Sequence, residues 1–311
     1  MADARIVSLI ASATEIVAAL GFEEQLVGRS HECDFPPGVE RLPAYSSSKV
    51  DTGATSWRID VQVRRLVAEA LSVYRVDPAQ LDRLAPTHII TQTQCEVCAV
   101  SLSDVERAVR ELVQSRPRVV SLEPMDLGDV WRDIRTVADA LNVAGRGHRL
   151  VDTLTARLDA VRAHTEALGK RPVIACIEWI DPLMHAENWI PELVRIAGGT
   201  IMIGEPGRHS GYFSMDDLVR HDPDVIAIMP CGFDIERSRK EMPPLATHPD
   251  WTRLSAVRAG RVYVTDGNQY FNRPGPRLVE SAEILAELLH PGAVDFGHRG
   301  SGWEPWCDAP R

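Results

Sequence analysis

Cysteine and histidine side chains gather in two short stretches of the N-terminal third of the chain. The first stretch is His-Glu-Cys-Asp at 31–34, and the second is Gln-Cys-Glu-Val-Cys at 94–98. A Cys-x-x-Cys pair lets two thiolates hold one ion, and a third thiolate or an imidazole would complete a soft tetrahedral site suited to zinc. The candidate metal ligands are His31, Cys33, Cys95 and Cys98. A redox-active or disulfide pair and ordinary loop cysteines remain open alternatives.

Other reactive side chains form no pattern that indicates catalysis. Glu178, Asp181, Glu187 and Asp234 could supply a general acid and base, but no spacing singles out a pair. His209 and Ser210 are adjacent in a Gly-rich stretch. The sequence contains no nucleophile elbow, P-loop or Gly-rich dinucleotide turn. We therefore assign no catalytic residue.

Short apolar runs alternate with helical periodicity, which predicts an α/β fold with mainly parallel sheets. The chain has 311 residues, above the size at which one hydrophobic core usually stops growing, so two lobes are expected. Between Leu127 and about Leu168 the pattern is helical, with a break expected near Gly145–Gly147. We predict an N-terminal α/β lobe over 1–125, a linking helix over 126–169 and a C-terminal α/β lobe with a short tail over 170–311.

Loops that follow parallel strands should line a ligand cleft between two such Rossmann-like lobes, because ligands of open α/β sheets bind beyond the carboxyl ends of the strands. Only 6% of the chain is aromatic, yet these loops contain Phe35, Trp179, Tyr270 and Phe271. Aromatic and apolar surface with a few polar groups suits a flat ligand. If that ligand carries its own metal, His31 or a thiolate could coordinate it.

Several segments, taken in order, resemble the family of cobalamin and ferric-siderophore substrate-binding proteins whose lobes are joined by a helical backbone. The segments lie between Arg5 and about His290, and they include 5–15, 33–37, 188–199, 214–226 and 273–278. The resemblance implies two lobes with a ligand between them and is nearest to the cobalamin-binding members. It also implies that Phe35 contacts a corrin, that Trp179 begins the matching loop of the C-terminal lobe, and that the segment Tyr270–Arg273, which includes Asn272, reaches the nucleotide side of the corrinoid. The segment Asp51–Arg75 looks like an insertion.

Charge and the first residues of the chain bear on its partners and location. The net charge is -10 and no stretch concentrates Lys and Arg on one face, so nucleic acid and anionic membrane surfaces are poor candidate partners. No apolar run approaches the roughly 20 residues that span a bilayer. The opening residues leave no room for a secretion signal, which predicts a cytoplasmic protein. By resemblance, family members dock to a transporter through acids, and Asp77 and Asp216 lie near the matching places; without export this docking is not expected.

Together these observations predict a binding protein rather than an enzyme. Its expected ligand is a small molecule, a corrinoid such as cobalamin or a similar metal chelate, and its expected role is that of a cytoplasmic carrier, reservoir or sensor. The alternatives are a metal-dependent enzyme on the same scaffold and a thiol-based metal-trafficking protein.

Overall fold

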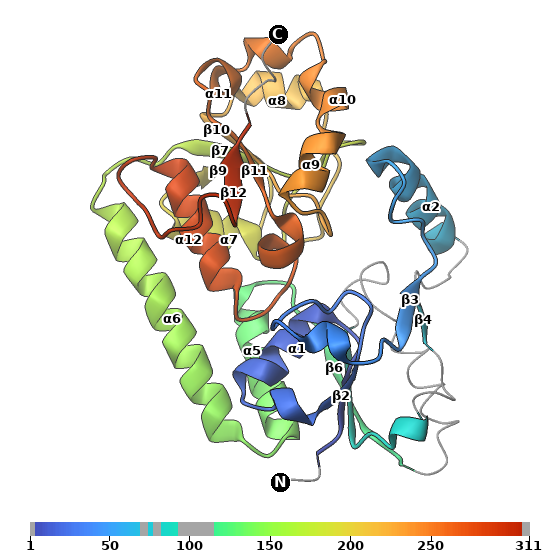
Figure 1. Cartoon of the computed structure of the whole chain (residues 1–311). Helices are drawn as coiled ribbons and strands as arrows, with labels where there is room; N and C mark the ends of the chain where they lie inside the picture. The colour runs from blue at the N-terminus through green and yellow to red at the C-terminus, as the bar shows by residue number, and fades with distance from the viewer. Residues whose placement is uncertain (1–3, 69–73, 77–81, 93–114, 307–311) are drawn as a thin grey trace. The chain divides into compact units, whose positions relative to one another are not determined.

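The computed structural model describes residues 4–68, 74–76, 82–92 and 115–306. The chain divides into two compact units. Unit 1 consists of Met1–Ala54, Arg58–Pro124 and Gly128–Thr153, and unit 2 of Thr55–Trp57, Met125–Leu127 and Leu154–Arg311. Each unit has its own β-sheet with helices packed against it (Figure 1). The predicted α/β fold with two lobes is confirmed.

Unit 1 is built on a sheet of four parallel strands in the order β2-β1-β5-β6. The strands are β1 (Ile6–Ser8), β2 (Leu26–Arg29), β5 (His88–Gln92) and β6 (Arg118–Leu122), and a separate antiparallel ribbon joins β3 (Ser46–Ser48) to β4 (Tyr74–Val76). Val7, Leu9 and Ile89 form a buried cluster on this sheet, with Val27, Leu84 and Val119 packed against it. The proposed insertion Asp51–Arg75 contains helix α2 (Ser56–Ala68) and runs into β4.

Helix α1 (Ala11–Ala19) begins earlier than its sequence predicts, because Ser-Ala-Thr-Glu at 12–15 is typical of a helix start with Ser12 as the N-cap. The N-cap residue is instead Ile10, which makes no side-chain capping bond. Ser12 lies inside the first turn and is buried. Burial of nearly the whole helix therefore stabilises α1 in place of a hydroxyl cap.

Two helices fill the region expected to link the lobes, α5 (Leu127–Ala140) and α6 (Ala144–Glu166), and the division between the units falls inside α6. The break expected near Gly145–Gly147 lies instead at 141–143, where Asn142 adopts a φ of +58°. A Cβ atom on Gly147 would lie 2.5 Å from the Cβ atom of Ala138. Gly147 is thus required by the close approach of α6 to α5, and the positive φ at Asn142 ends the first helix.

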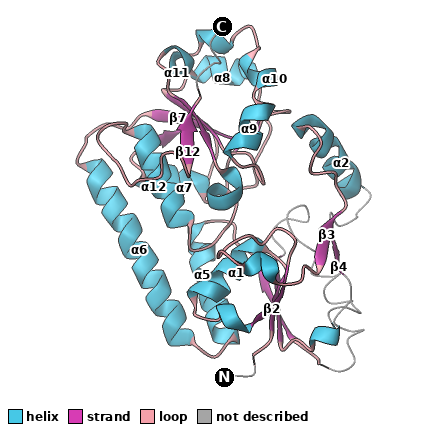
Figure 2. Ribbon diagram, in the orientation of Figure 1, coloured by secondary structure: helices cyan, strands magenta, loops and turns pink. Residues whose placement is uncertain are grey.

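Unit 2 is a three-layer α/β/α arrangement, with its strands lying between helices (Figure 2). The strand order is β12-β11-β10-β7-β8, and β9 also pairs with β7. The strands are β7 (Val173–Trp179), β8 (Met184–His185), β9 (Thr200–Ile201), β10 (Val225–Ile228), β11 (Val262–Thr265) and β12 (Trp303–Pro305). Strands β7, β9, β10 and β11 run parallel to one another, whereas β8 pairs antiparallel with β7 and β12 pairs antiparallel with β11.

Alternate residues of the unit 2 strands face opposite layers of helices, as the two-residue period of a strand requires. Ile226 and Ile228 of β10 belong to one core cluster with Trp251, Leu218 and Met242. Between them, Ala227 is also fully buried, so both faces of the strand are covered. The helices are α7 (Ile190–Ile196), α8 (Met215–His221), α9 (Ile235–Glu241), α10 (Pro243–Ala246), α11 (Ser255–Arg258) and α12 (Leu278–Leu289). The C-terminal segment predicted to be a plain tail contributes β12.

Candidate functional site

The carboxyl ends of β7, β10 and β11 form one edge of the unit 2 sheet, which we call the unit 2 rim. The rim consists of residues 178–187, 230–237 and 266–277. Because the three strands are parallel, the segments that follow them emerge at the same edge. The predicted ligand residues of the C-terminal lobe all belong to the rim.

An aromatic pair with a cation against it occupies the first part of the rim. The rings of Trp179 and Phe233 lie 5.1 Å apart at 44°, and the guanidinium of Arg237 lies 4.9 Å from the Phe233 centroid. Arg237 also forms a 3.0 Å ion pair with Glu241. Trp179 is partly buried, and its Nε1 donates to the carbonyl of Ser56, which belongs to unit 2. Trp179 is therefore held in place by a hydrogen bond as well as by ring packing.

The segment after β11 is a π-helical turn over Gly267–Phe271, held by its own polar side chains. The Asp266 carboxylate accepts from the backbone N–H of Gln269, and Asn272 Nδ2 donates to the carbonyls of Met229 and Gly267. A Cβ atom on Gly267 would lie 2.2 Å from the carbonyl oxygen of Pro230. Only glycine therefore permits this approach of β11 to the end of β10.

The predicted ligand residues at 270–273 have different surroundings. Tyr270 is partly exposed, with the Arg277 guanidinium 5.5 Å from its ring centroid. Phe271 is 1% exposed, and its carbonyl accepts from Trp189 Nε1 at 2.9 Å. Arg273 is buried and donates to Asn268 Oδ1 at 3.0 Å. Of these residues, Tyr270 is partly exposed, whereas Phe271, Asn272 and Arg273 hold the turn through buried or hydrogen-bonded groups.

Glu178, at the end of β7, is the most perturbed acid of the rim. Its Oε2 accepts a 2.6 Å hydrogen bond from Ser210 Oγ. Burial raises the pKa of Glu178 to about 7, the Ser210 bond opposes this change, and the carboxylate of Glu187 adds to it. Glu187 accepts from the backbone N–H of Glu205. These two carboxylates thus fix the segment 205–210 against the end of β7, and one of them changes charge near neutral pH.

Unit 1 presents a different set of groups at the carboxyl ends of β1 and β2. Thr14 Oγ1 lies 2.8 Å from Ser8 Oγ and 3.0 Å from Cys33 Sγ, and Cys33 is 1% exposed. His31 Nδ1 lies 2.9 Å from Ser46 Oγ. Burial lowers the pKa of His31, the carboxylate of Glu32 opposes this, and Arg29 reinforces it. Phe35, the predicted corrin contact of this lobe, is partly buried.

The predicted metal site is only partly within the described residues. Cys95 and Cys98 lie outside them, and Cys33 is buried against Thr14. Among the described residues, no group of three or more His, Cys, Asp or Glu side chains is arranged to hold an ion. The metal site, with zinc as its ion, therefore stays a prediction.

Sequence reasoning missed Phe233 and Arg237, which complete the aromatic pair. Gly-Phe-Asp at 232–234 follows directly after β10, and Asp234 caps α9 by accepting from the backbone N–H of Arg237. An Asp just after a buried strand is an N-cap signal for a following helix, and it could have located this contact. Tyr212, 54% exposed, was also passed over.

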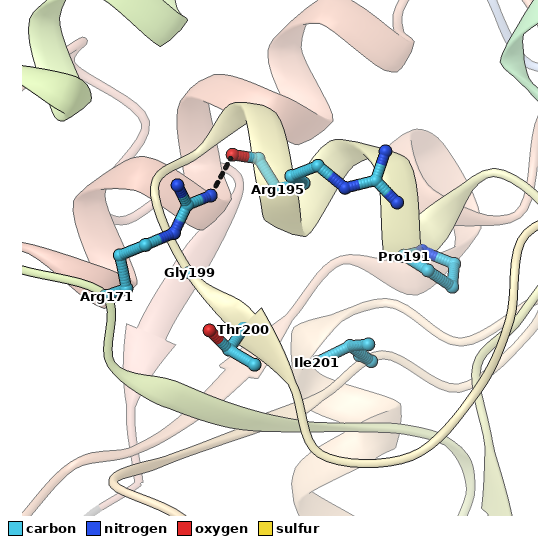
Figure 3. Close-up of a pocket in the computed structure, with 6 residues that line it drawn as sticks. All are labelled: Arg171, Pro191, Arg195, Gly199, Thr200 and Ile201. Carbon is cyan, nitrogen blue, oxygen red and sulfur yellow. Dashed lines mark hydrogen bonds between the residues drawn. The ribbon is translucent and has the colours of Figure 1, made fainter.

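At the other end of β7, unit 2 has a pocket of about 390 Å³ (Figure 3). Its lining residues are Arg171, Pro191, Arg195, Gly199, Thr200 and Ile201. These residues lie near the amino end of β7, whereas the rim lies at the carboxyl ends of the same parallel strands. The pocket is therefore separate from the candidate ligand residues.

Comparisons with known proteins agree over nearly the whole chain. The sequence model of a family described as "Periplasmic binding protein" matches residues 6–269. An uncharacterized ABC transporter substrate-binding lipoprotein, YvrC of Bacillus subtilis (strain 168), is 20% identical over 92% of this chain and 80% of its own length.

Solved structures resemble the fold of the chain. The apo periplasmic heme-binding protein RhuT from Roseiflexus sp. RS-1 has a TM-score of 0.70 and 22% identity, covering 93% of this chain and 99% of its own. The periplasmic vitamin B12 binding protein BtuF of Vibrio cholerae has a TM-score of 0.60 and 20% identity, covering 92% and 96%. The resemblance inferred from the sequence is confirmed.

These relatives overturn the predicted location. They are periplasmic proteins or lipoproteins of ABC transporters, so the prediction of a cytoplasmic protein is wrong. That prediction was based only on the first residues of the given sequence, and these residues do not establish where the protein is located. No helix in the described part of the chain is long and apolar enough to cross a membrane.

Proposed function

Because this chain belongs to the periplasmic binding protein family, we propose that it is the substrate-binding component of an ABC transporter and that its ligand is a planar metal chelate, a corrinoid or a heme. The names of two structural relatives supply the two ligand classes, vitamin B12 and heme. The proposal makes the unit 2 rim the recognition surface for that ligand.

The aromatic side chains of the rim carry this proposal. Trp179 and Phe233 pack as a pair, and Tyr270 lies under the Arg277 guanidinium. Rings of this kind offer apolar area and π-faces to a flat macrocycle, and the neighbouring cations suit amide or carboxylate groups at its periphery. The exposed Tyr212, two residues after the Ser210 that binds Glu178, would add a further ring.

Equilibrium titration with cobalamin, cobinamide and hemin tests the ligand class. We expect at least one of them to quench tryptophan fluorescence with a Kd below about 10 µM, and Trp179→Ala to weaken that binding about tenfold. Phe296→Ala is the matched control, because Phe296 is 38% exposed in unit 2 but lies outside the rim. If none of the three binds below about 100 µM, the ligand assignment is wrong.

Docking to a transporter is the second part of the proposal. Asp216 is exposed in the first turn of α8, where resemblance to the family indicates a docking acid. We expect Asp216→Lys to abolish ligand uptake by cells while leaving the ligand Kd within about twofold of wild type. Asp159→Lys is the control, because Asp159 is an exposed acid of α6 in unit 2 that lies outside the rim. Equal loss of uptake in both variants would contradict a role specific to Asp216.

A further inference from the structure

The pocket near the amino end of β7 lies beside an edge of the unit 2 sheet. It is formed between α7, which contributes Pro191 and Arg195, and the short strand β9, which contributes Thr200 and Ile201 (Figure 3). Among the described strands, β9 pairs with β7 alone. The side of β9 away from β7 is therefore an open strand edge with a hollow next to it.

The hydrogen bonds of β9 determine which backbone groups face that hollow. The N–H groups of Thr200 and Met202 donate to Pro172 and Ile174 on the β7 side. Successive residues of a strand point their backbone groups in opposite directions, so the N–H and C=O of Ile201 face away from β7. Ile201 thus offers one donor and one acceptor in the pattern that a further strand would use.

Two arginines of the pocket, Arg171 and Arg195, form no salt bridge within the described part of the chain. Arg171 Nη2 donates to the backbone carbonyl of Arg195 at 3.3 Å, and neither guanidinium is ion-paired with any described carboxylate. Elsewhere in unit 2, exposed arginines such as Arg208 and Arg220 pair with nearby acids. Figure 3 shows the two guanidiniums on different sides of the pocket, so they suit two separated negative groups rather than one small anion.

We propose that the β9 pocket binds an extended acidic peptide segment by strand addition. The backbone of the segment pairs with Ile201, and its carboxylate side chains reach Arg171 and Arg195, whose charges they neutralise. A small apolar side chain between the acids packs on Pro191 and Ile201 in the pocket floor. The alternative role for such charges is to keep other strands away from a short sheet edge, and that role predicts no binding.

The test uses the full chain and a short acetylated, amidated peptide that alternates glutamate with valine. Isothermal titration should show one saturable site with a Kd below about 1 mM. Two control peptides separate the contributions: glutamine in place of glutamate removes the charge, and N-methylation of alternate residues removes the strand-pairing donors. Both control peptides should bind about tenfold more weakly or not at all.

Three variants locate the site on the protein. Ile201→Pro removes a donor that the fold itself does not use, so it should weaken peptide binding about tenfold without lowering the Tm, and Ile201→Val should bind as wild type does. Arg195→Glu should weaken binding about as much as Ile201→Pro. Arg208→Glu is the control, because Arg208 is an exposed arginine of unit 2 outside the pocket.

Three results would overturn the proposal. The first is the absence of saturable binding below about 1 mM, which would indicate that the two arginines only keep other strands away from the edge of β9. The second is equal binding of the acidic and glutamine peptides. The third is binding that survives Ile201→Pro and Arg195→Glu but falls with Arg208→Glu.

Discussion

The two units share a parallel α/β plan but place different chemistry at the carboxyl ends of their strands. In unit 1 the hydrogen-bonded groups that the structure describes there are the hydroxyls of Ser8, Thr14 and Ser46, the thiol of Cys33 and the imidazole of His31. In unit 2 they are aromatic and charged, with the Trp179–Phe233 pair, Arg237 and Glu178. The same scaffold thus leaves the chemistry of its strand ends to individual residues.

This difference predicts which unit contributes most to ligand recognition and to its pH dependence. Hydroxyl networks such as Ser8–Thr14–Cys33 satisfy buried polar groups and change little with pH. Paired rings and a carboxyl whose pKa lies near 7 can hold a ligand and respond to pH. We therefore expect substitutions in unit 2 to dominate ligand affinity.

The largest expected effect tests whether each unit has its own core. Trp251 is fully buried in the unit 2 cluster, so Trp251→Ala should cost about 3–5 kcal/mol of unfolding free energy. Calorimetry should show that this loss lowers one unfolding transition and leaves a second in place. Trp57→Ala is the control, because Trp57 is 50% exposed, and it should cost less than about 1 kcal/mol. A single transition shifted as a whole would show that the units unfold together.

The next effect compares one buried carboxyl in each unit. Burial raises the pKa of Asp133 in unit 1, and of Glu178 in unit 2, to about 7. Such a group ionises more easily in the unfolded chain, so stability falls as pH rises from the usual carboxyl pKa toward 7 and is then constant. Glu178→Gln and Asp133→Asn should each raise stability at about pH 8 by ~1–3 kcal/mol relative to wild type, and much less at about pH 4.5.

Urea unfolding at the two pH values measures these gains, and ligand titration separates the carboxyls. Glu178→Gln keeps an acceptor for the Ser210 hydroxyl, so the segment 205–210 should stay in place. We expect ligand affinity to lose its pH dependence near neutrality in Glu178→Gln and to keep it in Asp133→Asn. Loss of this pH dependence in Asp133→Asn but not in Glu178→Gln would contradict the assignment of ligand recognition to unit 2.

Histidines of the two units should respond to acid in opposite directions. Burial lowers the pKa of His298 in unit 2, but its 2.9 Å hydrogen bond with Glu283 and the nearby carboxylates outweigh burial and raise the pKa overall. Its stabilisation is complete below the unfolded pKa of about 6.5 and is lost as pH rises through the folded pKa. His31 in unit 1 has a lowered pKa, so stability is lost as pH falls below about 6.5.

Substitution by glutamine checks these signs. His298→Gln should cost about 1 kcal/mol near pH 5.5 and less near pH 8.5. Wild type should lose stability on acidification through His31, and His31→Gln should not. The unfolding free energy of His31→Gln relative to wild type should therefore be higher near pH 5.5 than near pH 8.5. Thermal unfolding at both pH values distinguishes the two, and parallel shifts would contradict the assignment.

The smallest effect concerns how helices begin in the two units. Ser214 caps α8 in a capping box with Asp217, so Ser214→Ala should cost about 1 kcal/mol. Ser12 in unit 1 lies inside α1, and its buried hydroxyl has no hydrogen-bond partner among the described residues. Ser12→Ala should therefore be neutral or slightly stabilising. A cost for Ser12→Ala similar to that for Ser214→Ala would restore the predicted cap.

Much of the unit 2 framework could be predicted because its signals are local. Continuous apolar runs mark β7, β10 and β11, and the glycine pair at 198–199 marks the end of α7. The two-residue strands β8 and β9 and the antiparallel strand β12 were missed, since so few residues carry no readable period. The family resemblance also came from ordered local segments, and the family match over 6–269 confirms it.

The sequence alone determined the α/β alternation, the two-lobe plan and the family, because apolar spacing and short motifs act over a few neighbouring residues. Only the tertiary structure decided which rim residues face outward. Glu178 meets Ser210 from 32 positions away, and Trp179 meets Phe233 from a different strand end. The glycine at position 147 is required because any side chain there would clash with α5, and it does not mark a helix break. Burial, pKa and close packing depend on such distant partners, and one-dimensional spacing does not specify them.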